Sequence, residues 1–188
     1  MKDIQTTEPP SVLDELPGDL MMWVLIVSEL LVFGAGLAGF MSVRIMDPAG
    51  FAEAQDHLNR TAAGANTAIL VTSGFLAAKA LRLRETAKRA QARMMLTVAA
   101  VLGMVFLWIK ALEYRADAAA GITIDTNSFF TFYYLLTGFH AAHVVAGIVI
   151  LLLVAWRDAP RNIEVGAAFW HMVDLVWVLL FPVIYLLR

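Results

Sequence analysis

The sequence contains no cysteine, which excludes disulfides, thiolate metal sites and haem attachment through a CxxCH motif. Charged residues are also scarce, at 16% of the 188 residues, whereas hydrophobic residues make up 60%. This balance lies outside the range of ordinary soluble domains. The few basic residues gather in one loop and form no long amphipathic face, so nothing indicates nucleic-acid binding. The chain is predicted to be an integral membrane protein.

The first 18 residues lack the features of a signal peptide. Residues 1–18 have one lysine and four acidic residues, and they lack a basic start followed by an apolar stretch. We therefore expect an N-terminal tail over residues 1–18 and a first membrane span that stays in the mature protein.

Long apolar runs follow this tail. At about 1.5 Å of rise per residue, each run is long enough to cross a bilayer as a helix. Asp47 followed by Pro48 is typical of a helix start and predicts a short surface helix between the first two runs. The sequence thus predicts an all-α polytopic bundle of five transmembrane helices within residues 19–188. The expected spans are 20–43, 64–83, 94–113, 129–155 and 165–187.

Five spans place the two ends of the chain on opposite sides of the membrane. Lysine and arginine are more frequent on the side of the N-terminus, chiefly in the loop Arg82–Arg93. The positive-inside rule therefore predicts a cytoplasmic N-terminus.

The fourth span carries two histidines, His140 and His143, which share one helix face. Gly138, Ala142 and Ala146 repeat at every fourth position and lie roughly opposite. Small residues let another helix approach closely in a membrane. We expect the small face to contact helices of this chain and the histidine face to contact something else.

Several ionisable residues fall at similar depths in the membrane. Glu29 lies roughly 15 Å from the start of its span, and His143 and Asp174 reach a comparable depth. Polar groups at one depth tend to pair, because each would otherwise be isolated in hydrocarbon. The prediction is a lipid- or proton-linked polar layer in which Glu29 pairs with His143 and His171 pairs with Asp174. Its candidate residues are Glu29, His140, His143, His171 and Asp174.

This polar layer admits several interpretations. Glu29 and His143 form either a structural pair that fixes helix packing or a site that holds a phosphate or relays a proton. Alternatively, His140, His143 and His171 ligate haem or a transition metal. Two histidines three residues apart on one helix point the same way, which disfavours a haem between them. We expect no metal or cofactor, and we expect the five tryptophans to be interface anchors.

A second polar pair is predicted at the end of the third span. Lys110 and Glu113 are three residues apart and fall on one helix face, so we expect them to pair near the membrane interface.

The segments Thr137–Gly147 (TGFHAAHVVAG) and Phe169–Leu187 (FWHMVDLVWVLLFPVIYLL) resemble the last two helices of subunit III of haem-copper respiratory oxidases. Three earlier motifs agree in order, so the resemblance covers nearly the whole chain from Asp19 onward. It implies that Glu29 is the intramembrane carboxylate of the family and that His143, His171 and Asp174 occupy typical positions. The earlier motifs are WVLIVSELLVFG (Trp23–Gly34), ANTAILVTSG (Ala65–Gly74) and LGMVFLWIKALEY (Leu102–Tyr114).

The departures from the family are informative. Many subunit III chains have seven spans, with a lipid-filled cleft beside the first two, and the first two have no counterpart here. The loop after the first span lacks a WPP-type sequence, and Lys110 replaces a usual glutamine. These features resemble the branch associated with bacterial nitric oxide reductase.

The resemblance implies an accessory subunit without its own catalytic centre, located in the bacterial inner membrane. Such a subunit would stabilise a catalytic haem-copper subunit of the subunit I type and bind phospholipid. The partner complex would be a nitric oxide reductase or a cytochrome c oxidase. The alternative is a transporter or proton channel that uses Glu29, His143 and Asp174 as a relay, although the chain has no internal repeat of the kind many transporters use. A small membrane cytochrome is a further alternative.

Overall fold

The computed structural model describes residues 20–157 and 160–187, so the predicted tail over residues 1–18 lies outside the described part of the chain. Five helices in this part are long and apolar enough to cross a membrane, which confirms the predicted all-α multi-pass architecture. They are α1 (Leu20–Met46), α3 (Arg60–Glu85), α4 (Arg89–Ala119), α5 (Ser128–Arg157) and α6 (Pro160–Phe181), with a short α2 (Pro48–Asp56) between the first two.

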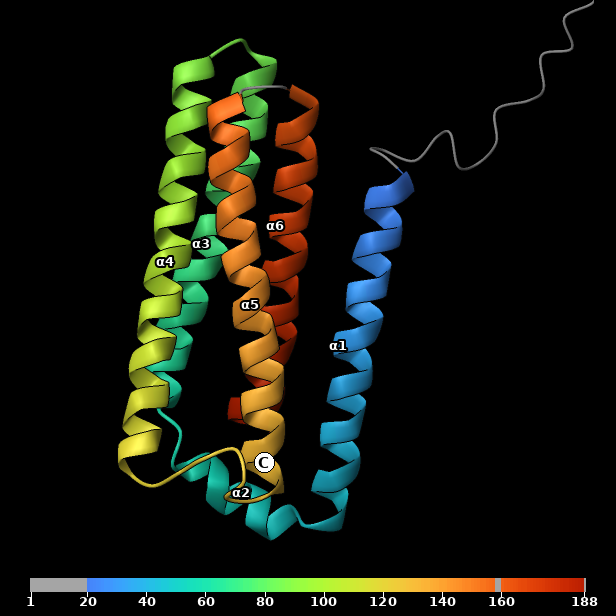
Figure 1. Ribbon diagram of the computed structural model, residues 1–188, viewed down its shortest axis with the longest axis vertical. Helices are drawn as coiled ribbons and strands as arrows, with labels where there is room; N and C mark the ends of the chain where they lie inside the picture. Colours follow the sequence, from blue (N-terminus) through green and yellow to red (C-terminus); the bar gives the residue numbers. More distant parts are fainter. Residues whose placement is uncertain (1–19, 158–159, 188) are drawn as a thin grey trace, which may run out of the picture.

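The helices α3, α4, α5 and α6 form a four-helix body, and α1 runs beside it (Figure 1). α1 contacts mainly α5 and α6. In the most apolar stretch of α1 only 6% of the residues are buried inside the protein, whereas 33–50% are buried in the corresponding stretches of the other four spans. Its buried side chains are Phe33, Phe40 and Arg44. Most of the surface of α1 is therefore left for lipid or another protein.

The surface helix α2 begins where the sequence predicts. The Asp47 side chain accepts a hydrogen bond from the Gly50 backbone N–H at 3.0 Å, and Pro48 is the first helical residue. Phe51 is buried and packs edge-on against Phe40 of α1 and Phe129 of α5, with ring centroids 5.3 and 5.5 Å apart. α2 thus fastens the end of α1 to the start of α5.

The last turns of the chain widen into a π-helix, η1 (Pro182–Leu186). The carbonyl groups in the last turn of a helix have no partner within the helix, so they need donors from elsewhere in the protein. Gln55 of α2 donates to the Ile184 carbonyl at 2.7 Å, and the Arg44 guanidinium of α1 donates to the Leu187 carbonyl. These two bonds tie α1 and α2 to the end of α6.

Two tryptophans fill the core instead of anchoring at an interface, contrary to the prediction. Trp170 and Trp177 are 0% and 1% exposed, and their indole N–H groups donate to Ser73 and Thr67 of α3 at 3.0 and 2.9 Å. The ring of Trp170 occupies space left by Gly147. A hydroxyl acceptor on the neighbouring helix makes a buried indole N–H acceptable.

The predicted orientation of α5 is reversed. His140 is fully buried, together with Thr137 and Val144 on the same side of α5. Ala142 and Ala146 are exposed on the outside. Thr137 finds a partner inside the bundle, the Tyr114 hydroxyl at 2.6 Å. Close helix approach occurs at Gly147 instead, where a Cβ would lie 2.5 Å from the Trp170 ring.

The turn between α3 and α4 contains a non-glycine residue in the left-handed region, Ala87 with φ 60°. This conformation costs an L-residue roughly 1–2 kcal/mol. We expect Ala87→Gly to stabilise the protein by about 0.5 kcal/mol, because part of the gain is offset by the greater freedom of glycine in the unfolded chain. Thermal unfolding in detergent would measure the change. Ala90→Gly, three residues on in α4, is the control and should destabilise the protein; a loss of stability in both variants would contradict the expectation.

Candidate functional site

The centre of the candidate site is a pair formed between α1 and α5. Oε2 of Glu29 lies 3.1 Å from Nε2 of His143, and the two side chains are 25% and 15% exposed. Phe33 and Phe139 stand against the His143 ring, with centroids 5.5 and 4.6 Å away. The structure thus brings together the two groups that the sequence places at one depth.

The other ring nitrogen of His143 is hydrogen-bonded within α5. Nδ1 lies 2.9 Å from the backbone oxygen of Phe139. A carbonyl oxygen only accepts hydrogen bonds, so Nδ1 carries a proton. Oε2 of Glu29 is within ion-pair distance of Nε2 but has no hydrogen-bond partner among the described residues.

His140 lies one turn away from this pair and takes no part in it. It is 0% exposed, and neither of its ring nitrogens has a hydrogen-bond partner among the described residues. Its ring stacks on Trp177 at 5.2 Å and meets the edge of Phe106 at 5.7 Å. The environment of His140 is therefore an aromatic box inside the four-helix body.

His171 and Asp174 form a separate site on α6, facing α3. A Cβ at Gly74 would collide with Oδ2 of Asp174 and would lie 3.5 Å from Nδ1 of His171. Asp174 is 7% exposed and its Oδ1 has no hydrogen-bond partner among the described residues. In that same part of the chain the structure gives no hydrogen bond or ion pair between His171 and Asp174. The predicted pairing of these two residues is absent, because Asp174 turns into the space left by Gly74 while His171 stays exposed.

The predicted polar layer is therefore divided. Trp170 packs against Gly147, and Asp174 and His143 each lie four residues, or about 6 Å, further along in the same direction. Their depths agree, but Asp174 faces α3 whereas His143 faces α1. A shared depth does not make them partners.

Lys110 and Glu113 do pair, but inside the bundle. Nζ of Lys110 lies 3.1 Å from Oε2 of Glu113, and the Lys110 side chain is only 2% exposed. Their position near the membrane interface stays a prediction, and α4 itself continues beyond them to Ala119. The end of α4 that carries these charges stays inside the bundle, because side chains of other helices form hydrogen bonds with its charged groups.

Two tyrosines that sequence reasoning missed complete this cluster. Lys110 donates to the hydroxyls of Tyr133 at 2.9 Å and Tyr185 at 2.6 Å, and Tyr185 donates to Oε1 of Glu113 at 2.9 Å. Tyr133 is placed to donate to Asp117, although at 3.4 Å this bond is long. The Lys110 ammonium also lies 4.4 Å from the centroid of the Tyr133 ring. We call Lys110, Glu113, Asp117, Tyr133 and Tyr185 the lysine cluster.

No group of three or more histidine, aspartate or glutamate side chains in the described residues is arranged to hold a metal ion. The expectation that the chain binds no metal or cofactor stays a prediction.

Comparison with known proteins places the chain in a family. The family model of cytochrome c oxidase subunit III matches residues 17–188. A cytochrome c oxidase subunit 3 from Thermostichus vulcanus is 31% identical over 89% of this chain and 86% of its own length. One from Synechocystis sp. is 30% identical over 90% of this chain and 76% of its own length, and one from Bacillus subtilis is 26% identical over 89% and 85%. From its five spans, its ordered motifs and these relatives, the chain belongs to the cytochrome c oxidase subunit III family.

Proposed function

We propose that this protein is a non-catalytic accessory subunit of a haem-copper respiratory complex, which docks in the membrane against a catalytic subunit of the subunit I type and stabilises it. The family match over residues 17–188 carries the proposal. The relatives above are named for cytochrome c oxidase. A nitric oxide reductase partner is the alternative that the five-span resemblance favours. The N-terminus is proposed to be cytoplasmic, from the positive-inside bias.

In this proposal the Glu29–His143 pair holds α1 against the four-helix body. α1 has few buried residues, so one polar contact in the bilayer is a large share of what fixes its position. Phospholipid is proposed to fill the remaining space. An apolar pocket of about 310 Å³ between α1 and the helices α5 and α6 supports this, with Leu25, Ile150 and Phe169 among its walls.

The rival function, a proton or solute path through Glu29, His143 and Asp174, needs these groups to communicate. Asp174 faces α3, and among the described residues it has no hydrogen bond to either member of the pair. A relay would have to cross this separation, so the accessory role is the better supported proposal.

We expect Glu29→Ala to leave the haem spectrum of the complex intact and to shorten its active lifetime several-fold. An interhelical hydrogen bond in a membrane contributes roughly 0.6–1.7 kcal/mol, which corresponds to this change in a rate. Glu29→Gln is the matched control, because its amide N–H can donate to Nε2 of His143, and it should retain most of the lifetime. The measurements are co-purification in mild detergent and loss of turnover with time. Immediate loss of turnover with a normal lifetime would argue for a direct chemical role instead.

A further inference from the structure

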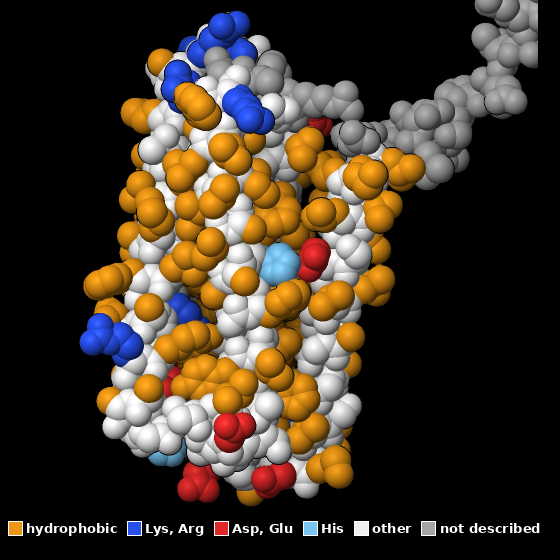
Figure 2. Space-filling model, viewed as in Figure 1, with side chains coloured by type: hydrophobic (Ala, Val, Ile, Leu, Met, Phe, Trp, Pro, Cys, Tyr) orange, Lys and Arg blue, Asp and Glu red, His pale blue; other side chains and the backbone are white. Residues whose placement is uncertain are grey.

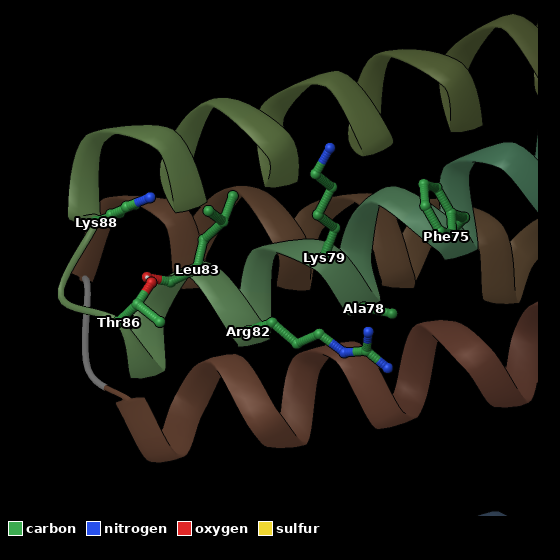
Figure 3. Close-up of a pocket in the computed structure, with 7 residues that line it drawn as sticks. All are labelled: Phe75, Ala78, Lys79, Arg82, Leu83, Thr86 and Lys88. Carbon is green, nitrogen blue, oxygen red and sulfur yellow. The ribbon is translucent and has the colours of Figure 1, made fainter.

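A pocket of about 470 Å³ lies at the end of α3 and the turn into α4 (Figure 3). One part of its lining is apolar and comes from Phe75, Ala78 and Leu83, whereas the other part carries the cationic side chains of Lys79, Arg82 and Lys88. Lys79 extends toward α4, Arg82 extends toward α6, and Lys88 stands at the turn into α4 (Figure 3). The pocket therefore combines a hydrophobic wall with three positive charges placed around it.

The three cations are not neutralised within the described part of the chain. Residues 20–157 and 160–187 contain no carboxylate in an ion pair with Lys79, Arg82 or Lys88. The pocket lining has no acidic residue, and Glu85 is the one acid in the surrounding stretch from Lys79 to Arg93. Figure 2 shows a group of lysine and arginine side chains at this end of the molecule, whereas most of the acidic side chains visible in that view lie elsewhere. The pocket thus has the charge to hold an anion.

The position of the hydrophobic wall identifies the kind of anion. Phe75 is 64% exposed and lies seven residues before Arg82 on α3, so it is about 10 Å closer to the middle of the span. An exposed aromatic side chain at that depth faces lipid chains rather than water. A soluble anion would use the cations and leave Phe75 without a role, whereas a phospholipid uses both.

We propose that this pocket binds an anionic phospholipid, with its phosphate between Lys79, Arg82 and Lys88 and an acyl chain along Phe75 and Ala78. The inference deepens the lipid-binding part of the proposed function and rests on it. With the N-terminus in the cytoplasm, the pocket opens to the cytoplasmic leaflet, where anionic lipids create a negative surface potential. Basic pockets between transmembrane helices on this side are suited to anionic headgroups.

The experiment is a titration of the delipidated full chain in detergent with phosphatidylglycerol or phosphatidylcholine, read by native mass spectrometry. We expect tighter binding of phosphatidylglycerol, weakened by added salt. The K79Q/R82Q variant should lose about thirtyfold in phosphatidylglycerol affinity, since each cation near a membrane surface contributes about a factor of five. The control R93Q/R115Q removes the same charge from two exposed arginines outside the pocket and should lose little. Phe75→Ala should weaken the binding of both lipids, because it removes part of the apolar wall that both acyl chains contact.

Several results would overturn the inference. Equal losses in K79Q/R82Q and R93Q/R115Q would mean that net charge, and not this pocket, attracts the lipid. Displacement by inorganic phosphate at equal concentration would identify a soluble-anion site. If K79Q/R82Q does not fold, the single variant R82Q and the salt dependence of the unaltered chain decide between the same outcomes. Co-purification of the chain with a catalytic subunit is measured separately, so failure of the accessory role and failure of the lipid site are distinguishable.

Discussion

Glu113→Gln is expected to lower the free energy of unfolding by about 3 kcal/mol. Glu113 is the carboxylate nearest to the buried ammonium of Lys110, at 3.1 Å, and it also accepts a hydrogen bond from Tyr185. Removing one member of a buried ion pair leaves the other charge uncompensated, which typically costs about 3–5 kcal/mol. We place the effect at the lower end because Tyr133 and Tyr185 still accept from Lys110. Unfolding of the purified chain in mixed detergent micelles would measure it.

The double variant Lys110→Met/Glu113→Gln should recover most of this loss. Methionine fills the volume of the lysine stem without a charge, and a buried ion pair can often be replaced by neutral groups at little cost. Glu85→Gln, at the exposed end of α3, is the control for removing one carboxylate and should change stability by less than about 0.5 kcal/mol. A double variant less stable than Glu113→Gln alone would contradict the ionic interpretation of the cluster.

Gly147→Ala is expected to cost about 1–3 kcal/mol through overpacking. The added Cβ would lie 2.5 and 2.6 Å from two ring carbons of Trp170. The indole cannot move away easily, because it is fully buried and its N–H is bound to Ser73 at 3.0 Å. Gly34→Ala in α1 is the matched control, since its Cβ meets no atom within 4 Å. The same unfolding measurement applies to both.

Trp170→Phe tests the cause of that loss. The smaller ring should relieve the clash, so the double variant Gly147→Ala/Trp170→Phe should be more stable than the sum of the two single losses predicts. Strict additivity would show that the cost of Gly147→Ala arises elsewhere, and equal stability of Gly147→Ala and Gly34→Ala would contradict the predicted clash.

The sequence was sufficient to predict the five spans and the α2 helix. Apolar runs in a membrane protein are constrained by bilayer thickness, and the pair Asp47–Pro48 marks a helix start by local chemistry alone. The far end of α4 was missed because Lys110, Glu113 and Asp117 look like the edge of a span. Their spacings of three and four residues place them on one helix face, and this signal could have extended the prediction to Ala119.

The sequence predicted contacts in the candidate site only where the depth of each residue in the membrane was sufficient to identify its partner. Glu29 and His143 were matched by counting residues along two helices, and the structure brings them within 3.1 Å. The depth of a residue does not show how its helix is rotated about its own axis. The sequence therefore could not show that His143 and Asp174 belong to two different sites. The glycine that accommodates Asp174 comes from another helix, and Tyr185 reaches Lys110 from 75 residues away. Both depend on tertiary packing, which a local pattern cannot show.

The contacts of α1 with helices that come much later in the chain have a consequence for the synthesis of the protein. α1 leaves the ribosome before its partners on α5, α6 and η1. Arg44 and the Leu187 carbonyl are 143 positions apart. At about 5–20 residues per second, translation of that interval takes on the order of 10 s. Throughout this wait the Glu29 carboxyl has entered the bilayer before its imidazole partner exists. α1 is thus inserted before the helices that fix it in place have been made, and it has to be accommodated by lipid or by other proteins until α6 has followed.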